Sequence, residues 1–456
     1  MYFPRVAHIG CLASYHLRRR SAKLALRGCA DVLYTDKIPH HVDTSKLPYE
    51  VVRLPPELVQ SPLDMLSWLQ QDLTHRQIHI LHSHSTHYPA NLGLFCSDVI
   101  RINTIWDFVY SKDPLSPLFH RAILDGLESR RLAEAVSFSS PVVRAEWLRR
   151  GYPAESALLH SWGVDLEVFN ETNGEEIAKL RSSLGIADHE LVVLSSRTTS
   201  PPANLDILVQ AVLQLRTQLP VRLVVIGGTV TREARWLEYL LGDWPEREAV
   251  IFSGSLHNDH ALRCFYEVAD VVASIHTNDH NPATVLESLA IGRPVVVCNV
   301  PSVMHWARDE ETGFVVPERD VEATARALHR ALTLSRTERE TMSQAGKRLI
   351  KEQADFAMTL DKVSEDYARL ALCPPAPHPG MYEQGLLMDI YDQPRQAAEQ
   401  YKRALEEGQM LEMLDPLLRE KKRLLDPWAE PEYFFQDRAQ PGMSDLVSAP
   451  EIEWPH

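Results

Sequence analysis

The stretch SIHTNDHNPATVLESLAIG, residues 274–292, indicates the fold of the region around it. It follows a short apolar run, residues 270–275, which is typical of a buried strand. It continues into a helical pattern that Gly292 closes, and a second apolar run follows at residues 294–298. The sequence therefore predicts a polar loop that leaves a strand at its carboxyl end and enters the N-terminus of a helix. In an open α/β sheet, ligands bind at such a position.

A helix that starts here predicts a phosphate site with an acid on each side. The N–H groups of Thr284, Val285 and Leu286 would be free at the positive end of that helix, which suits an anion. Asp279 lies on the loop, and Glu287 follows after seven residues, one turn into the helix. This pattern favours a ligand that joins a phosphate to hydroxyl groups. A structural alternative remains, because an acid near a helix start is commonly only a cap.

Together with GRPVVV at residues 292–297 and ETGFVVP at residues 311–317, the stretch resembles a known donor-sugar site. The family is that of the retaining family-4 glycosyltransferases of GT-B fold, the glycosyl transferases group 1. Its members carry a Glu, seven residues and a second Glu before a segment ending in Gly-x-Pro-Val-Val. The second Glu holds the ribose hydroxyls of a nucleotide sugar, so the resemblance assigns that role to Glu287. Asp279 replaces the first Glu, and the resemblance implies that it contacts the sugar.

The resemblance covers roughly residues 5–372 of the 456-residue chain and implies an α/β fold of GT-B type. Two Rossmann-like domains would face each other across a cleft, and a helical extension would follow. The expected bounds are an acceptor domain at 1–170, a donor domain at 175–355, a helix crossing back to the first domain at 356–372 and an acidic extension at 373–456. The length itself is too great for one ordinary core.

The first predicted strand ends at Gly10, where a backbone can pass close to a ligand. The family has a glycine-rich loop near the donor phosphates at this point, so Gly10 is a donor-site candidate. The helix after it carries five basic residues: Arg18, Arg19, Arg20, Lys23 and Arg27. They form either a solvated face or a patch for an acceptor with phosphate or carboxylate groups. For a membrane, such a patch would give at most weak peripheral contact.

The run HILHSHSTH, residues 79–87, contains histidines that invite a metal interpretation. We predict no metal site here, because no acid or thiol stands nearby in sequence. The family instead has a strand ending in His-x-His near its cleft, which makes His82 a cleft candidate and His84 a catalytic one. Trp106 stands where many members have a His that contacts the transferred sugar, and its ring could stack on a sugar. Asp107 is the polar candidate beside it.

Arg197 follows the predicted strand 191–195, where a guanidinium can hold a diphosphate in a fork. The family pairs such an Arg with a Lys that precedes Asn-x-Asp. Asn204 and Asp206 are present here, but Ala203 occupies the place of the Lys. With Asp279 and His84, Arg197 completes the predicted catalytic set.

The composition excludes some classes of protein. The net charge is −15, made of 18 basic and 17 acidic residues up to position 170 and 29 basic and 45 acidic ones beyond it. A nucleic-acid binder would be basic, so no nucleic-acid partner is expected. No run of eighteen apolar residues or signal-peptide core occurs, so we expect a cytoplasmic protein. The six cysteines are scattered, which argues against a disulfide framework or a zinc site.

The prediction is therefore a retaining glycosyltransferase that moves a sugar from a nucleotide-diphosphate sugar to a hydroxyl of a glycan, glycolipid or small molecule. It would need no metal or other cofactor, because the helix terminus and Arg197 would carry the leaving phosphate's charge. Two alternatives stay open. One is a catalytically weakened nucleotide-sugar-binding protein, which fits Trp106 and Ala203. The other is a sugar-nucleotide epimerase of the same fold.

Overall fold

The computed structural model describes residues 4–40, 42–85, 89–105, 118–170, 174–197, 203–226, 247–253, 259–277, 279, 281–375, 380–391 and 393–407. The chain divides into two compact units. The first holds Met1–Ser116 and Ile123–His378, and the second holds Pro117–Ala122 and Pro379–His456. Both β-sheets lie in the first unit, and every strand pairing in them is parallel. Such sheets arise where buried apolar strands alternate with helices.

The first sheet has seven strands in the order β3-β2-β1-β4-β5-β6-β7. Their bounds are β1 Val6–Ile9, β2 Val32–Thr35, β3 Glu50–Arg53, β4 Ile80–His84, β5 Ile100–Ile105, β6 Ala135–Phe138 and β7 Ala157–Leu159. The helices along this part of the chain are α1 Tyr15–Ala25, α2 Pro62–His75, α3 Leu118–Glu128 and α4 Pro141–Arg149. The strand order reverses between β1 and β4, and this topological switch is where ligands bind in doubly wound sheets.

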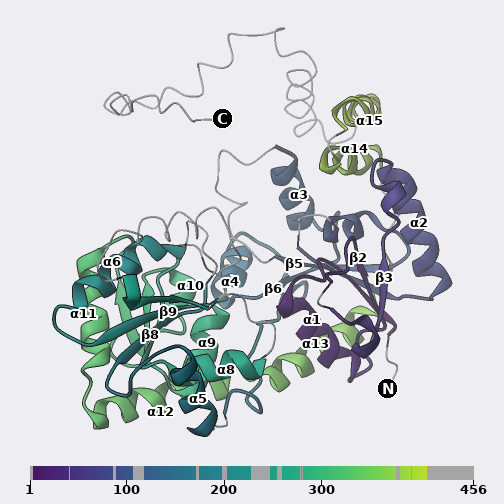
Figure 1. Ribbon diagram of the computed structural model, residues 1–456. Coiled ribbons are helices and arrows are strands. Elements are labelled where there is room, and N and C mark those ends of the chain that lie inside the picture. The colour runs from purple at the N-terminus through teal and green to yellow at the C-terminus, as the bar shows by residue number, and fades with distance from the viewer. Residues whose placement is uncertain are drawn as a thin grey trace, which may run out of the picture. The chain divides into compact units, whose positions relative to one another are not determined.

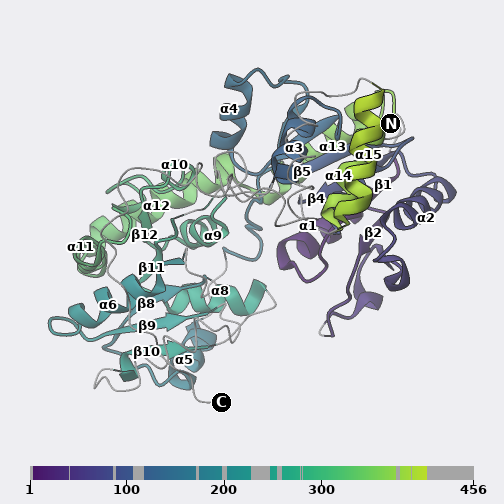
Figure 2. The same ribbon diagram turned by 90° about the horizontal axis from the view of Figure 1, so that it is seen from above.

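The second sheet has six strands in the order β10-β9-β8-β11-β12-β13, and the labelled ones follow one another in Figure 2. Their bounds are β8 Leu191–Ser195, β9 Val221–Val225, β10 Val250–Phe252, β11 Val271–Ser274, β12 Val295–Cys298 and β13 Gly313–Val316. The helices are α5 Gly174–Ser183, α6 Leu205–Leu215, α8 Asp259–Val268, α9 Ala283–Ile291, α10 Pro301–Met304, α11 Val321–Leu332 and α12 Arg336–Gln353. Figure 1 shows these helices around the sheet.

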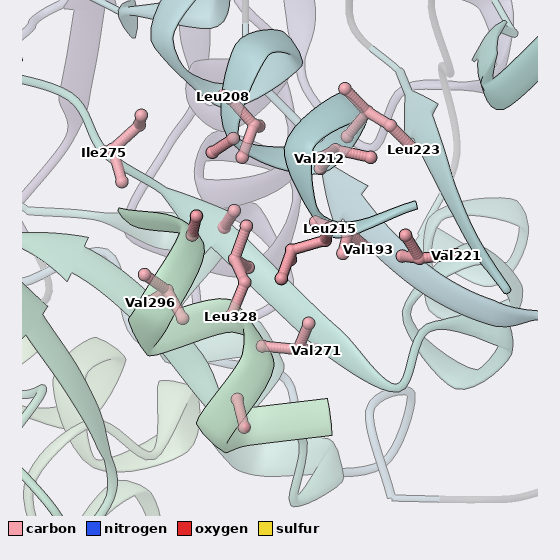
Figure 3. Close-up of a cluster of buried hydrophobic side chains, with 14 of the residues drawn as sticks. Val193, Leu208, Val212, Leu215, Val221, Leu223, Val271, Ile275, Val296 and Leu328 are labelled. Carbon is pink, nitrogen blue, oxygen red and sulfur yellow. The ribbon is translucent and has the colours of Figure 1, made fainter. Parts of the chain in front are cut away.

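The second sheet buries an apolar core on each face. On one face α6 and α11 pack against the strands, as Leu208, Val212 and Leu328 show in Figure 3. On the other face the core includes Phe265 of α8 and Leu289 of α9. Both faces are covered, so the strands are near-continuous runs of Val, Ile and Leu. This covering leaves the strand ends as the places where polar groups can meet a ligand.

The predicted strand, loop and helix around residues 274–292 form as expected. β11 ends at Ser274, α9 runs from Ala283 to Ile291, and β12 lies beside β11. Gly292 ends α9 with a φ of 81°, a left-handed conformation that glycine adopts without a steric penalty. The loop is thereby held between a buried strand and a buried helix.

Helix α13, Phe356–Leu370, packs on the first sheet although it follows the second in sequence. The chain passes beside itself at this point, because Val164 donates to the carbonyl of Ala354 at 2.7 Å and Phe356 donates to that of Val164 at 3.0 Å. Gly163 has a φ of 67°, and a Cβ there would stand 2.8 Å from Phe356 Cα. A glycine is therefore required where the two segments cross.

In the second unit, α14 (Met381–Ile390) and α15 (Pro394–Glu406) form a helical hairpin. Tyr401 is fully buried and donates to Asp389 Oδ2 at 2.5 Å. A Cβ at Gly385 would stand 2.4 Å from the Tyr401 ring, so the glycine lets the two helices approach. Among the residues that the structure describes, no helix is long and apolar enough to cross a membrane.

Candidate functional site

The loop between β11 and α9 carries the predicted phosphate site, and its free donors differ from the prediction. Val285 and Leu286 both donate their N–H groups to the carbonyl of Pro282, at 2.8 and 3.0 Å. The prediction that these two N–H groups are free is therefore wrong, because the first turn of α9 closes on Pro282. Thr284 lies one residue closer to the helix start and is buried.

Asn281, which the sequence analysis did not single out, immediately precedes this helix. Its amide oxygen and nitrogen are both buried, and neither has a hydrogen-bond partner among the described residues. Buried amides are normally hydrogen bonded, so this one marks a place for a polar ligand group. Ser302 bonds the carbonyl of Asp279 and ties the loop to the start of α10. Ser302 thus holds the loop backbone at Asp279, and the side-chain amide of Asn281 is available to bond a ligand.

Arg197 and Asp279, two predicted catalytic residues, form an ion pair with each other. Arg197 Nε also donates to Ser274 Oγ at 2.9 Å, which fixes the guanidinium at the carboxyl end of β11. Burial lowers the pKa of Arg197 to about 10, although Tyr266 and Glu287 raise it in part. The pair brings a cation and an acid from two strands to the loop that leads into α9.

Glu287 is buried and bonded through both carboxylate oxygens. Tyr266 donates to Oε2 at 3.1 Å, and Arg19 Nη1 lies 3.4 Å from Oε1. Burial raises the pKa of Glu287 to about 7, although the Arg19 charge lowers it in part. Arg19 Nη1 also lies 3.0 Å from Asp259 Oδ1. A single guanidinium from α1 therefore serves two acids of the second sheet's helices.

Hydroxyl groups extend this site. Ser196 Oγ lies 2.8 Å from the Tyr266 hydroxyl and donates to Thr284 Oγ1 at 3.0 Å. Ser196 follows β8, Tyr266 lies on α8 and Thr284 lies on α9, so three elements meet here. The sequence predicted that the backbone N–H of Thr284 binds a phosphate. The structure shows instead that its side-chain hydroxyl accepts a hydrogen bond from Ser196.

Three residues of this site were not predicted from the sequence: Asp259, which pairs with Arg19, and Tyr266 and Ser196, which are hydrogen bonded to each other. Arg19 appeared only as one of five basic residues, and Asp259 has the form of an ordinary helix-start acid. Their meeting depends on contacts across 240 and 268 residues of sequence. No local pattern indicates such a pair.

Gly10 lies at the carboxyl end of β1, where close packing rather than a ligand accounts for the glycine. A Cβ on Gly10 would stand 2.8 Å from Leu17 Cδ2 and 3.3 Å from His84 Cβ. Helix α1 therefore approaches the strand at this glycine. Its predicted contact with donor phosphates stays a prediction.

The prediction that His82 lines a cleft is wrong. His82 is fully buried, with Nδ1 2.6 Å from the Tyr367 hydroxyl of α13 and Nε2 2.6 Å from Thr104 Oγ1. His84 is also buried, and its Nε2 lies 2.7 Å from His8 Nδ1. Alternation along β4 places both rings on the face that α13 covers. A catalytic role for His84 stays a prediction.

Two groups of side chains have the spacing of metal ligands. His8, His82 and His84 form one, with ligand atoms within 4.8 Å of one another; Glu176, His260 and Cys264 form the other. In the first group the ring nitrogens already bond each other and their neighbours. In the second, Arg263 lies 3.3 Å from Glu176 and places a positive charge beside the group. Neither arrangement favours a cation.

The basic residues of the first helix do not form a solvated patch. Arg20 is buried and Arg19 is occupied by Asp259 and Glu287. Lys23 lies 3.0 Å from Asp165 Oδ2, and Arg27 pairs at 3.2 Å with Asp361 of α13. The interpretation as one solvated face is therefore wrong for Arg19 and Arg20, because helix packing buries them, and a role of this helix in binding an anionic acceptor stays a prediction.

Ala203 is buried just before α6. Asn204 donates to the carbonyl of Ile275 at 2.8 Å and accepts from Arg319, which also pairs with Asp206 at 2.9 Å. The Asn and Asp of the family pattern thus brace the loop after β11. Trp106 and Asp107, predicted to contact the sugar or acceptor, lie outside the described residues.

Residues 176–349 match the sequence model of a family described as "Glycosyl transferases group 1". A D-inositol 3-phosphate glycosyltransferase from Stackebrandtia nassauensis is 33% identical over 179 residues, which are 38% of this chain and 40% of that protein. The chain thus spans about two fifths of the length of the curated relatives it matches, and for this relative the covered share is 40%.

Two solved structures share the fold. Anabaena Alr3699/HepE in complex with UDP-glucose superposes with a TM-score of 0.67 at 17% identity, over 80% of this chain and 100% of that one. Sucrose-phosphate synthase from Thermosynechococcus elongatus gives a TM-score of 0.67 at 18% identity, over 80% and 99% of the two chains. The predicted α/β fold of GT-B type is confirmed.

Proposed function

Residues 176–349 belong to the glycosyl transferases group 1 family, and from this we propose that the chain is a glycosyltransferase using a nucleotide-diphosphate sugar. The observation that carries the proposal is the convergence of Arg197, Asp279 and Glu287 around the start of α9. These are the residues that the family resemblance assigns to the donor. The similar Anabaena structure in complex with UDP-glucose supports the choice of donor class.

In this proposal each group meets one part of the donor. The ribose hydroxyls donate to Glu287, which lies beside Tyr266. The diphosphate meets Arg197 and the positive end of α9, where backbone dipoles and a guanidinium stabilise the charge that develops on the leaving group. Asn281 provides a buried amide with no partner among the described residues at the same helix end. Asp279 exchanges its bond with Arg197 for one with the transferred sugar.

We propose further that transfer retains the configuration of the sugar and needs no divalent metal. In a site of this kind, Arg197 and the helix terminus would carry the charge that a metal ion would otherwise carry. Activity should therefore survive excess EDTA. A loss that manganese or magnesium restores would contradict this part of the proposal.

A second candidate is a nucleotide-sugar-binding protein with weak or no catalysis. It is favoured by the buried Ala203 in place of the family's Lys, which leaves one cation fewer near the leaving diphosphate. Incubating the full chain with UDP-, GDP- and ADP-sugars separates the candidates. Slow hydrolysis of one donor supports the transferase, binding without turnover supports the second candidate, and sugar interconversion supports an epimerase. Arg197→Ala, which removes the proposed diphosphate ligand, is the matched inactive control.

A further inference from the structure

The first sheet changes from apolar to polar along the face that α13 covers. At the amino ends of five strands this face carries members of one apolar core cluster: Val6, Ile80, Ile102, Ala135 and Leu158. Two residues further along the same strands, or just past the end of β7, it carries polar side chains: His8, His82, Thr104, Ser137 and His160. All five are buried. A buried polar layer therefore lies at the carboxyl end of the sheet, where doubly wound folds bind ligands.

Most of this layer is hydrogen bonded within itself and carries no charge. His160 Nε2 lies 3.1 Å from Asp366 Oδ2, and Ser137 Oγ lies 3.0 Å from His160 Nδ1. Burial lowers the pKa of His8 and of His160 to about 4, so both rings are neutral near pH 7. Asp366 is engaged on its other oxygen by Lys362 and Arg369. Its negative charge is thus already balanced.

Arg20 of α1 adds a positive charge to this layer, and no described acid forms an ion pair with it. It is 2% exposed, and its Nη1 donates to the carbonyl of His160 at 3.1 Å. Its Nε and Nη2 are buried and have no partner among the described residues. Burial lowers the pKa of Arg20 to about 10, and Tyr367 raises it only in part. An arginine keeps its proton at neutral pH, and a buried charge without a partner is costly.

Other unpaired polar atoms lie around Trp162. The Arg20 guanidinium carbon is 5.7 Å from the Trp162 ring, and the His16 ring is 5.3 Å from it. His16 Nδ1 and Ser161 Oγ are buried and, among the described residues, have no partner either. Native proteins leave few buried polar atoms unpaired, so four such atoms indicate a polar ligand: three on Arg20 and His16, whose side chains lie beside the Trp162 ring, and one on Ser161, the residue before Trp162.

The position of His16 relates this place to the donor site. Burial, together with the charges of Arg19 and Arg197, lowers the pKa of His16 to about 3. The neutral ring is therefore close to both guanidiniums, one of which is the proposed diphosphate ligand.

We propose that Arg20, His16 and Ser161 form an oxyanion subsite beside Trp162, and that it holds a phosphate or carboxylate group of the sugar acceptor. The fork of unpaired N–H donors on Arg20 suits such a group. The same positive charge opposes a divalent cation at His8, His82 and His84. The assignment of the bound group to the sugar acceptor rests on the proposed function, whereas the oxyanion subsite does not depend on that function.

The test is thermal unfolding of the full chain at increasing concentrations of inorganic phosphate, in a buffer free of other oxyanions. A ligand that binds only the folded state raises the unfolding midpoint. We expect phosphate to raise the unfolding midpoint of the native chain. For Arg20→Met, the same rise should need a phosphate concentration at least about tenfold higher. Arg149→Gln, which removes an exposed arginine of the same domain, should behave like the native chain.

Further variants keep the outcome decisive. If Arg20→Met does not fold, Arg20→Lys keeps the charge without the fork and Ser161→Ala removes one donor; both should weaken the phosphate effect. Arg197→Met should retain it. An effect that is lost in Arg197→Met but kept in the Arg20 and Ser161 variants would place phosphate at the donor site and overturn the subsite. So would an equal effect in all variants.

The source of the oxyanion is decided by comparing ligands. A hexose 6-phosphate and gluconate represent acceptors with a phosphate and a carboxylate. A stabilisation by either that depends on Arg20 supports an anionic acceptor. A response to inorganic phosphate alone would overturn the acceptor assignment. Because donor hydrolysis is measured separately, a chain that hydrolyses a nucleotide sugar without any Arg20-dependent anion binding refutes the subsite and leaves the proposed function intact.

Discussion

Arg19 Nη1 lies 3.4 Å from Glu287 Oε1, so a side chain of the first helix occupies the carboxylate proposed to hold the donor ribose. Arg19 is 7% exposed and Glu287 3%, which makes this a buried contact. The same nitrogen lies 3.0 Å from Asp259. Donor binding through Glu287 therefore has to compete with an ion pair that joins elements of the two Rossmann-like domains.

We predict that Arg19→Gln binds UDP-glucose more tightly than the native chain at pH 8. When only a fraction of the protein is competent to bind, the apparent affinity is reduced by that fraction. Removing the ion pair should therefore increase the apparent affinity for UDP-glucose about three- to tenfold. Calorimetric titration measures the change, with Arg149→Gln as control. Weaker binding by Arg19→Gln would instead mean that Arg19 itself contacts the donor.

Glu287→Gln should weaken UDP-glucose binding by about 1–3 kcal/mol, because a charge-assisted hydrogen bond to the ribose is lost. The pKa of about 7 adds a pH dependence. Native affinity should rise between pH 6 and 8 as the carboxyl group ionises, and the variant should show no such rise. Calorimetry at four pH values checks both points. Equal affinity of the two proteins at pH 8 would remove Glu287 from the donor site.

Arg197→Ala should abolish donor hydrolysis and transfer, since it removes the only proposed side-chain cation at the leaving diphosphate. Ala203→Lys should increase turnover or donor affinity by restoring the family's second cation. Steady-state kinetics with the accepted donor measure both variants, and circular dichroism checks their folding. Near-native activity of a folded Arg197→Ala protein would show that the diphosphate is held elsewhere.

Acid should destabilise the chain through its buried histidines. Burial lowers the pKa of His8 and His160 to about 4, whereas an unfolded histidine titrates near pH 6.5. The unfolded state therefore binds more protons between these values, and stability falls as pH drops from about 6.5 toward 4. At pH 5 each such histidine should cost about 2 kcal/mol relative to pH 7.5.

Glu287 acts in the opposite direction. Its raised pKa means that the folded state holds the proton more tightly, so its contribution is present at low pH and is lost as pH rises through about 7. It should offset roughly one histidine between pH 7.5 and 5. Urea unfolding at pH 5 and pH 7.5 measures the free energy of unfolding, and the difference between the two values gives the net effect of the histidines and Glu287. His160→Asn should lessen the acid loss, and an unchanged loss in that variant would contradict the assignment.

Gly163→Ala should destabilise the chain more than Gly185→Ala. Both glycines have a φ of 67°, so the conformational cost is matched. A Cβ on Gly163 would lie 2.8 Å from Phe356 Cα, whereas one on Gly185 would meet nothing within 4 Å. The difference should be about 1–3 kcal/mol, the usual cost of overpacking. Thermal unfolding of the two variants compares them, and equal midpoints would show that the crossing segments can move apart.

The local features could be predicted from sequence because each depends on neighbouring residues. Strand β11, helix α9 and the left-handed Gly292 followed from an apolar run, a helical period and the conformational freedom of glycine. The donor-site candidates Arg197 and Asp279 followed from their places after strands β8 and β11. Val285 and Leu286 were misjudged by a single turn, because the start of a helix depends on which carbonyl accepts its first bond.

What the sequence by itself determined is therefore the alternation of strands and helices, the two-sheet class and the loop at which charged side chains gather. Tertiary structure alone decided which charges meet. Arg19 and Glu287 are separated by 268 residues, and their pairing depends on how α1 and α9 are presented by different sheets. His82 likewise became a core residue because α13 returns across the first sheet. Such partners are set by long-range packing, for which periodicity and spacing carry no signal.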